Sequence, residues 1–265
     1  MPIAIEMSFA FRAQQPTDVL LQFEAAAIPE QQLSNTRTSL SDSPHIARIP
    51  AQDTIGERIW VRAEGRFEAS YTATASIERV AGTLDELGAV PMRNLPGEAA
   101  PYLFDSRYCP ADRFQSFIDA EFADRSGGAL VATLHDWIAK NFTYTPGSSG
   151  PNTNALDSFV ERRGVCRDYA HMLITFARAA GIPARFVSAY APDVSPPDFH
   201  ALAEVFLEDP AQPEGGAWYL VDATNMSKPD QVVKIGVGRD AADVSFLTSF
   251  GPTEFLEKHV SVRQE

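Results

Sequence analysis

The sequence predicts an α+β protein, in which an antiparallel β module is followed by a region where helices precede a second antiparallel sheet. Three observations predict this fold class. Alternating and β-branched segments fill the first hundred residues, helical periodicity begins near Ala111, and period-two patterns return after Gly181. The length of 265 residues allows two domains with separate cores. We place a β-rich module in residues 1–105 and a second, catalytic domain in residues 106–265.

Composition and charge restrict the class of partner. The chain carries 22 Lys and Arg against 35 Asp and Glu, a formal net charge of −13. Nucleic acids and anionic lipids attract basic patches, so we expect neither a nucleic-acid partner nor a membrane partner. The start, MPIAIEMSFAFRAQQP, lacks the features of a secretory signal, and no apolar run is long enough for a membrane span. We therefore expect a cytoplasmic protein, and its oligomeric state stays open.

The first region reads as strands separated by turns. Alternation and aromatic or β-branched residues predict four strands, at residues 5–11, 18–26, 57–63 and 67–80. Clusters of Pro, Ser, Asn, Asp and Gly separate them. A segment rich in Pro and turn residues follows at about 90–105, and we interpret it as the linker to the second domain.

The second region begins with helices. Apolar residues recur at spacings of three and four on both sides of the Gly127–Gly128 break: Phe114, Phe117, Ile118 and Phe122, then Leu130, Leu134, Trp137 and Ile138. A short helix at 155–162 follows, capped by Asn154 and stopped at Gly164. After Gly181 the pattern becomes that of strands, in IPARFVSAY, FHALAEVFL and AWYLVDAT, with further candidates at 231–237 and 255–262.

Cys166 occupies the most informative position in the chain. Residues 165–180 form an amphipathic helical pattern that ends at Gly181, so Cys166 lies in the first helical turn. The free amides and the dipole at a helix start favour an anion, which makes a thiolate there a stronger nucleophile at neutral pH. Arg167 adds to this effect and Asp168 opposes it. A small buried cysteine packed under the helix is the alternative interpretation.

A thiol nucleophile needs a base and a group that orients the base. His200 opens the strand FHALAEVFL, and Asp222 lies in AWYLVDAT. If these strands pair antiparallel with His200 opposite Asp222, Leu207 lies opposite Gly215 and residues 208–214 form the loop. Both prolines of that loop then fall outside the ladder. Taken singly, His200 could be a surface histidine and Asp222 a turn residue, but their shared face favours a pair.

The remaining cysteine and histidines carry less chemistry. Cys109 lies in a turn before a proline, and two cysteines without an export signal predict free thiols rather than a disulfide. His171 is expected at the edge of the core, hydrogen-bonded to backbone. His45, His135 and His259 show no partner pattern and are expected at the surface. No CxxC or HxxxH spacing occurs, so we expect no metal site and no cofactor.

These residues resemble a known family. The runs GVCRDYAH, GIPARFVSAY, HALAEV and DATN occur in the order found in bacterial transglutaminase-like proteins, over residues 127–226. That family has a papain-like core with a Cys-His-Asp triad, and its bacterial members often carry an N-terminal β module. The resemblance implies Cys166 as nucleophile, His200 as base and Asp222 as the orienting carboxylate. The chain departs from the family pattern at Leu202, where Trp is common, and at Ala223, where Pro is common.

The implied chemistry is acyl transfer on amide bonds of a peptide or protein, through a thioester that water or an amine acceptor resolves. The Cys166 amide is the expected oxyanion donor, and Tyr144 in NFTYTPGSS is the side-chain candidate. We rank hydrolysis above crosslinking. Two alternatives stay open: a catalytically silent binding module of the same fold, and an arylamine acetyltransferase-like enzyme. Calcium dependence is also open, although no EF-hand-like run occurs.

Overall fold

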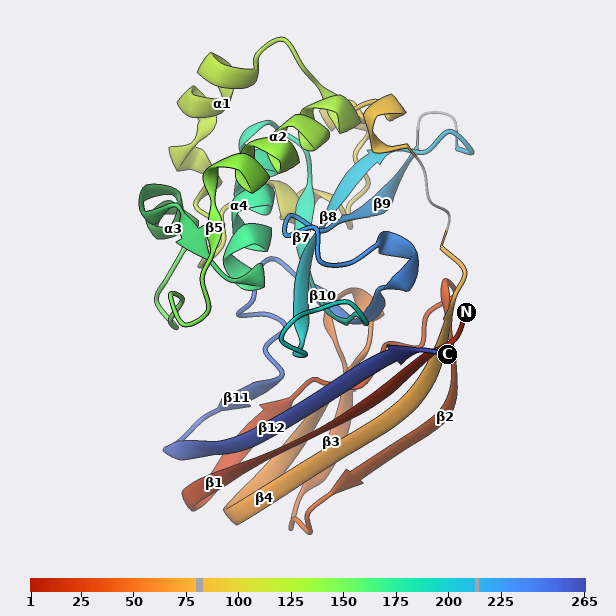
Figure 1. Cartoon of the computed structure of the whole chain (residues 1–265), viewed down its shortest axis with the longest axis vertical. Helices are drawn as coiled ribbons and strands as arrows, with labels where there is room; N and C mark the ends of the chain where they lie inside the picture. Colours follow the sequence, from red (N-terminus) through yellow and green to blue (C-terminus); the bar gives the residue numbers. More distant parts are fainter. Residues whose placement is uncertain (80–82, 213–214) are drawn as a thin grey trace.

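A computed structural model describes residues 1–79, 83–212 and 215–265 of the chain. Its antiparallel sheets and four α-helices confirm the predicted α+β class. In Figure 1 the long strands of the first sheet lie together at the bottom, the helices cover the top, and a shorter second sheet lies between them. The protein therefore stacks one sheet beneath a helix-covered sheet.

The first sheet is built on two long strands. β1 (Ile3–Leu21) and β4 (Glu57–Ile77) pair antiparallel along most of their length, with an irregularity between Ala13 and Thr17. β1 joins the predicted segment 5–11 with the first four residues of 18–26, and β4 joins 57–63 with residues 67–77 of the segment 67–80. Of the latter, residue 80 lies outside the described residues. Alternate side chains of both strands are buried, as the period-two pattern predicts.

The two strands that pair with β4 on its far side from β1 were not predicted. β2 (Gln31–Leu40) and β3 (Ile46–Pro50) pair with opposite ends of β4 and form the edge of the sheet. Most of the β2 side chains are exposed or half-buried, so its sequence QQLSNTRTSL carries no apolar alternation. Because an edge strand is held mainly by its backbone hydrogen bonds, its sequence need not show a buried face.

The last strands of the chain complete the first sheet. β11 (Leu247–Ser249) and β12 (Thr253–Gln264) both pair antiparallel with β1, and β12 matches Ile3 to Gln264 and Ala13 to Thr253. The sequence assigns residues 255–262 to the second region because they follow it along the chain, whereas their hydrogen bonds go to β1. The division at residue 105 itself stays a prediction.

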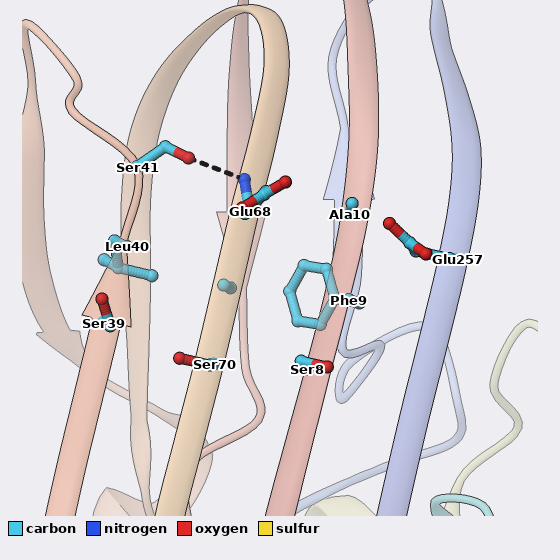
Figure 2. A pocket seen from close by; sticks show the side chains of 10 residues that line it. Ser8, Phe9, Ala10, Ser39, Leu40, Ser41, Glu68, Ser70 and Glu257 are labelled. Atoms are coloured by element: carbon cyan, nitrogen blue, oxygen red, sulfur yellow. Dashed lines mark hydrogen bonds between the residues drawn. The ribbon is translucent and has the colours of Figure 1, made fainter.

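The solvent face of the first sheet carries a shallow groove of about 400 Å³. Figure 2 shows three serines on adjacent strands lining it, Ser39, Ser70 and Ser8. Ser70 is the register partner of both other serines. The groove contains no cysteine or histidine, and it shares no lining residue with the cavity that holds Cys166.

The helices surround a buried central helix. α1 (Gln115–Phe122), α2 (Gly127–Asn141) and α3 (Ala155–Glu161) all contact α4 (Cys166–Ala179), and the second sheet covers its other side. Every residue from Asp168 to Arg178 is buried, so α4 lacks the exposed face that its amphipathic pattern predicts. The buried Arg178 is compensated by hydrogen bonds to backbone carbonyls, including that of Ala184 at 2.9 Å. Over the described ranges, no helix is long and apolar enough to cross a membrane.

The second sheet has the strand order β10-β7-β8-β9. Its members are β7 (Ala184–Tyr190), β8 (His200–Glu208), β9 (Gly216–Val221) and β10 (Val233–Gly238). All four match predicted strands. Together with a short parallel pair, β5 (Thr143–Tyr144) and β6 (Arg163–Gly164), they position the site described below.

The predicted register between β8 and β9 was wrong by two residues. Ala203 lies opposite Val221 and Leu207 opposite Ala217, so β9 ends before Asp222. Because side chains alternate with a period of two, this shift keeps every residue on its predicted face. Leu202 and Leu220 still share one cluster behind the sheet. The loop expected at 208–214 includes residues 213 and 214, which lie outside the described residues.

A buried ionic cluster links the second sheet to the first region. Glu204 on β8 is fully buried; it pairs with Arg185 at 2.7 Å and also with Lys234. Lys234 in turn pairs with Glu30. Burial alone would raise the pKa of Glu204, but the two cations outweigh it and lower the pKa to about 2. Glu204 is therefore a charged structural residue on the His200 face of β8.

Candidate active site

The start of α4 is fixed by the carboxylate of Asp168, which lies in the first turn and bonds to the residue before the helix. Asp168 Oδ2 accepts the Val165 N–H at 2.8 Å, and its Oδ1 accepts the Ser149 hydroxyl at 2.8 Å. Gly164 must be a glycine here, because an added Cβ would lie 2.5 Å from the Asp168 Cβ. Asp168 thus holds the turn that presents Cys166, a role that its charge alone did not indicate. Cys166 is the first residue of the helix and is half-buried.

His200 and Asp222 form a buried pair. His200 Nε2 lies 2.8 Å from Asp222 Oδ2, and the two residues are 1% and 6% exposed. Among the described residues, the second ring nitrogen, Nδ1, has no hydrogen-bond partner within normal geometry. The Cys166 thiol is close enough to contribute to the His200 pKa. Because Nε2 is bonded to Asp222, Nδ1 is the ring nitrogen available to the thiol. The structure brings the three predicted residues together.

The pKa values of this pair move in opposite directions. Burial disfavours the imidazolium form, but the hydrogen bond and charge of Asp222, together with Cys166, outweigh it and raise the pKa of His200 to about 9. Burial also disfavours the carboxylate, but His200, Thr224 and Ser227 outweigh it and lower the pKa of Asp222 to about 2. The site therefore favours an imidazolium paired with a carboxylate near neutral pH.

Asp222 is held by a polar turn that directly follows β9. Its Oδ1 accepts the Thr224 N–H and hydroxyl at 2.9 and 2.6 Å, and its Oδ2 accepts the Ser227 N–H and hydroxyl at 2.8 and 2.7 Å. The sequence interpretation missed both partners, although an Asp followed by Thr and Asn is a known turn signal. Four donors besides His200 therefore fix the orientation of this carboxylate.

His135 was wrongly expected to be a surface histidine without a partner. It lies on α2, where its Nε2 is 3.2 Å from the Asp222 backbone oxygen and its side chain is 18% exposed. The two residues are 87 positions apart, so no local pattern joins them. His135 supports the backbone that carries Asp222.

Tyr144 lies beside Cys166, as its candidate role requires. Its strand β5 pairs in parallel with β6, which directly precedes α4. Burial raises the pKa of Tyr144 to about 12; the charge of Cys166 adds to this rise, and a hydrogen bond with the Cys166 backbone opposes it. The phenol therefore adjoins both the backbone amide and the thiol of Cys166. Its ring also packs near Tyr169, with centroids 6.0 Å apart.

A cavity of about 540 Å³ opens beside the thiol. Cys166 and His200 line it together with Phe186 and Ser188 of β7. Lys258 of β12 also lines it, so the first sheet contributes to the wall of this cavity. The sequence could not reveal this contribution because Lys258 belongs to a strand that we assigned to another sheet.

The other candidate residues have structural environments. Cys109 is fully buried, and burial raises the pKa of its thiol to about 12. His171 is fully buried rather than at the core edge, and its Nε2 accepts the Ala241 N–H at 3.2 Å, as expected for a backbone-bonded histidine. Burial lowers the pKa of His171 well below its ordinary value. Within the part of the chain that the structure describes, no group of three His, Cys, Asp or Glu residues is arranged to hold a metal ion.

A thiol at a helix start beside a buried His–Asp pair is the arrangement of proteins with cysteine-nucleophile chemistry. Comparison with known proteins agrees with this class. The family model of the transglutaminase-like superfamily matches residues 119–223. A crystal structure of a candidate cysteine protease from Cytophaga hutchinsonii is 32% identical, covers 99% of this chain and 90% of its own, and superposes with a TM-score of 0.89. The chain belongs to the transglutaminase-like superfamily.

Two curated relatives match less than half of the chain. An uncharacterized protein of Mycobacterium leprae is 35% identical over 124 residues, which cover 45% of this chain and 43% of the relative. A protein-glutamine gamma-glutamyltransferase of Pseudomonas aeruginosa is 33% identical over 117 residues, which cover 39% of this chain and 17% of the relative. The chain thus matches less than half the length of either curated relative.

Proposed function

We propose that the protein is a cysteine amidase or peptidase in which Cys166 is the nucleophile, His200 the general base and acid, and Asp222 the group that orients His200. The observation that carries this proposal is the 2.8 Å bond between His200 Nε2 and Asp222, which leaves Nδ1 free beside the thiol at the start of α4. The two pKa shifts support it, because they favour a charged imidazolium able to stabilise a thiolate.

The reaction follows from these positions. The Cys166 sulfur forms a bond to the carbonyl carbon of an amide, and the developing oxyanion is met by the Cys166 N–H and the Tyr144 hydroxyl. His200 gives its proton to the departing amine as the carbon–nitrogen bond breaks. Water then attacks the thioester, losing its proton to His200, and releases the acid and the free thiol. Asp222 holds the imidazole in one tautomer throughout.

Transamidation is the second candidate function. It is favoured by the similarity to the Pseudomonas protein-glutamine gamma-glutamyltransferase over 117 residues. In that reaction a primary amine replaces water as the attacking group on the same thioester, and the residues keep the same roles. The two functions differ only in the acceptor, so product analysis with and without an added amine separates them.

The nucleophile assignment predicts selective alkylation. We expect brief iodoacetamide treatment at pH 6 to modify Cys166 at least about a hundredfold faster than Cys109, since Cys166 is half-buried beside His200 whereas burial protects Cys109 and raises the pKa of its thiol. Peptide mass spectrometry measures both rates in one sample. Similar rates at the two cysteines, or no modification of Cys166, would refute an activated thiol.

The oxyanion assignment predicts a specific kinetic defect. Tyr144→Phe removes only the hydroxyl, so we expect kcat to fall by about 10²- to 10³-fold with little change in KM. The substrate is the peptide amide that the wild type cleaves fastest. Tyr219→Phe is the matched control, since the partner of its hydroxyl within the described part of the chain is the Glu208 carbonyl at the surface. A Tyr144→Phe variant with kcat within twofold of the wild type would exclude this role.

A further inference from the structure

The cavity beside Cys166 has a charge opposite to that of the whole protein. The chain carries a formal net charge of −13, yet three Arg and Lys residues line this cavity besides His200: Arg107, Arg167 and Lys258. Asp198 is the carboxylate among the lining residues. A cluster of cations inside a cleft of an acidic protein concentrates anionic ligands there.

Two of the three residues, Lys258 and Arg167, make polar contacts with the protein. Lys258 Nζ lies 2.5 Å from Asp198 Oδ1, so these two charges compensate each other. Arg167 donates to the carbonyls of Gly150 and Thr153 at 2.6 and 3.2 Å, and it lies 3.6 Å from the buried Asp168. These contacts, all made by Nη2, hold the loop that precedes α3, and among the described residues Nε of Arg167 has no hydrogen-bond partner.

Arg107 is different. Its side chain is exposed, and within residues 1–79, 83–212 and 215–265 it makes no hydrogen bond or ion pair. Its guanidinium carbon lies 5.1 Å from the centroid of the Tyr108 ring, and that of Arg167 lies 5.2 Å from the same ring. Cation–π contact orients a guanidinium while leaving its N–H donors available.

The ring that supports Arg107 is firmly held. Tyr108 donates its N–H to Asp240 Oδ2 at 2.9 Å and its hydroxyl to the Pro151 carbonyl at 2.8 Å. Its ring also stacks on His171, with centroids 5.1 Å apart. A fixed ring places the Arg107 guanidinium at the cavity wall at a lower entropic cost than an unsupported arginine would pay.

We propose that Arg107 binds a carboxylate of the substrate, so that the amide substrates of this protein are acidic. A planar guanidinium can donate two parallel hydrogen bonds to a carboxylate, which the ammonium group of Lys258 cannot do and for which Arg107, unlike Arg167, has every N–H exposed and uncommitted among the described residues. The carboxylate belongs either to an Asp or Glu side chain or to a chain terminus. This inference rests on the proposed function, because it concerns the substrate of the same thiol.

Two alkylating reagents of different charge test the subsite. With iodoacetate and with iodoacetamide, the Cys166 sulfur bonds to the same CH₂ group and iodide leaves, but only iodoacetate carries a carboxylate. We expect the ratio of the iodoacetate rate to the iodoacetamide rate at Cys166 to fall about threefold to fivefold in Arg107→Gln. Added NaCl should lower the ratio in the wild type more than in the variant.

Arg125→Gln is the matched control, since Arg125 is also exposed and lies between α1 and α2, outside the cavity lining. In Arg125→Gln, the ratio of the iodoacetate rate to the iodoacetamide rate at Cys166 should equal that of the wild type. An unchanged ratio in Arg107→Gln, with Cys166 still reactive toward iodoacetamide, overturns the carboxylate subsite and leaves the nucleophile assignment intact. Failure of iodoacetamide itself at Cys166 overturns the nucleophile assignment and the subsite together.

Protection of Cys166 from labelling distinguishes a side-chain carboxylate from a terminal one. N-acetylglutamate α-amide carries only a side-chain carboxylate, N-acetylglutamine only a terminal one, and N-acetylglutamine α-amide neither. We expect one of the two charged compounds to slow iodoacetamide labelling of wild-type Cys166 more than the neutral one does, and this difference to vanish in Arg107→Gln. Equal protection by all three compounds in the wild type contradicts the proposal.

Discussion

Cys166→Ala is expected to abolish turnover, lowering kcat at least about a thousandfold on any peptide amide that the wild type cleaves. Alanine removes the sulfur that forms the thioester and leaves the His200–Asp222 pair in place. The fold should survive, because Asp168 rather than Cys166 holds the start of α4. Turnover is measured on a fluorogenic peptide library, with and without a primary amine, and thermal unfolding checks the fold.

Cys109→Ala is the matched control for that experiment. It removes the other thiol, which lies in the core with its S–H directed at the His171 carbonyl at 3.7 Å. We expect a loss of about 1–3 kcal/mol in stability with turnover retained. Retained turnover in Cys166→Ala would exclude Cys166 as the nucleophile. A wild type without turnover under both conditions would favour the catalytically silent module, and turnover only with acetyl-CoA would favour the acetyltransferase-like alternative.

Asp222→Asn should give the second largest loss, about 10³- to 10⁴-fold in kcat. In the wild type, Asp222 Oδ2 accepts hydrogen bonds from His200 Nε2 and from the Ser227 N–H and hydroxyl. In the variant, the NH₂ group of the asparagine would face these donors. To avoid a donor–donor contact, the imidazole would place its proton on Nδ1, where it can no longer accept the thiol proton. Steady-state kinetics measure this loss. Asp119→Asn, on the exposed face of α1, is the control and should keep full activity.

The same variant changes how stability depends on pH. Folding raises the pKa of His200 from 6.5 to about 9, so its contribution is complete below pH 6.5 and is lost as the pH rises through 9. Folding lowers the pKa of Asp222 from 3.8 to about 2, so its contribution is complete above pH 3.8 and is lost as the pH falls through 2. Urea unfolding between pH 6 and 9 should show wild-type stability converging on that of Asp222→Asn. If the stabilities of the wild type and Asp222→Asn changed in parallel over this pH range, the stabilising role of the His200–Asp222 pair would be contradicted.

Much of the fold could be predicted from local patterns. The helix after Val165 and the strands β7 and β8 have unbroken apolar periods, because nearly every residue of each element is buried. The edge strands β2 and β3 could not be predicted, since backbone hydrogen bonds hold them and their side chains face water. The N-cap of α3 was predictable because Asn154 and Asp157 form a local capping box.

The candidate site divides in the same way. Cys166, His200 and Asp222 could be chosen as candidates because each is marked by its position at the start of a helix, in a strand or directly after one, and a two-residue error in register does not change the face on which a side chain lies. The contacts of His135 with the Asp222 backbone and of Asp168 with Ser149 were missed. Both join residues that are neighbours only after the helices have packed.

The sequence by itself determined the fold class, the order of the main elements and the three residues of the proposed triad, because helical and strand periods and helix starts are local properties of the chain. Only the tertiary structure decided that β12 completes the first sheet and that its Lys258 reaches the cavity beside Cys166. It also decided that Arg107 stands there on the Tyr108 ring without a protein partner among the described residues. Such placements depend on long-range strand pairing and packing, whose energies are shared by residues far apart in the chain and leave no local pattern in it.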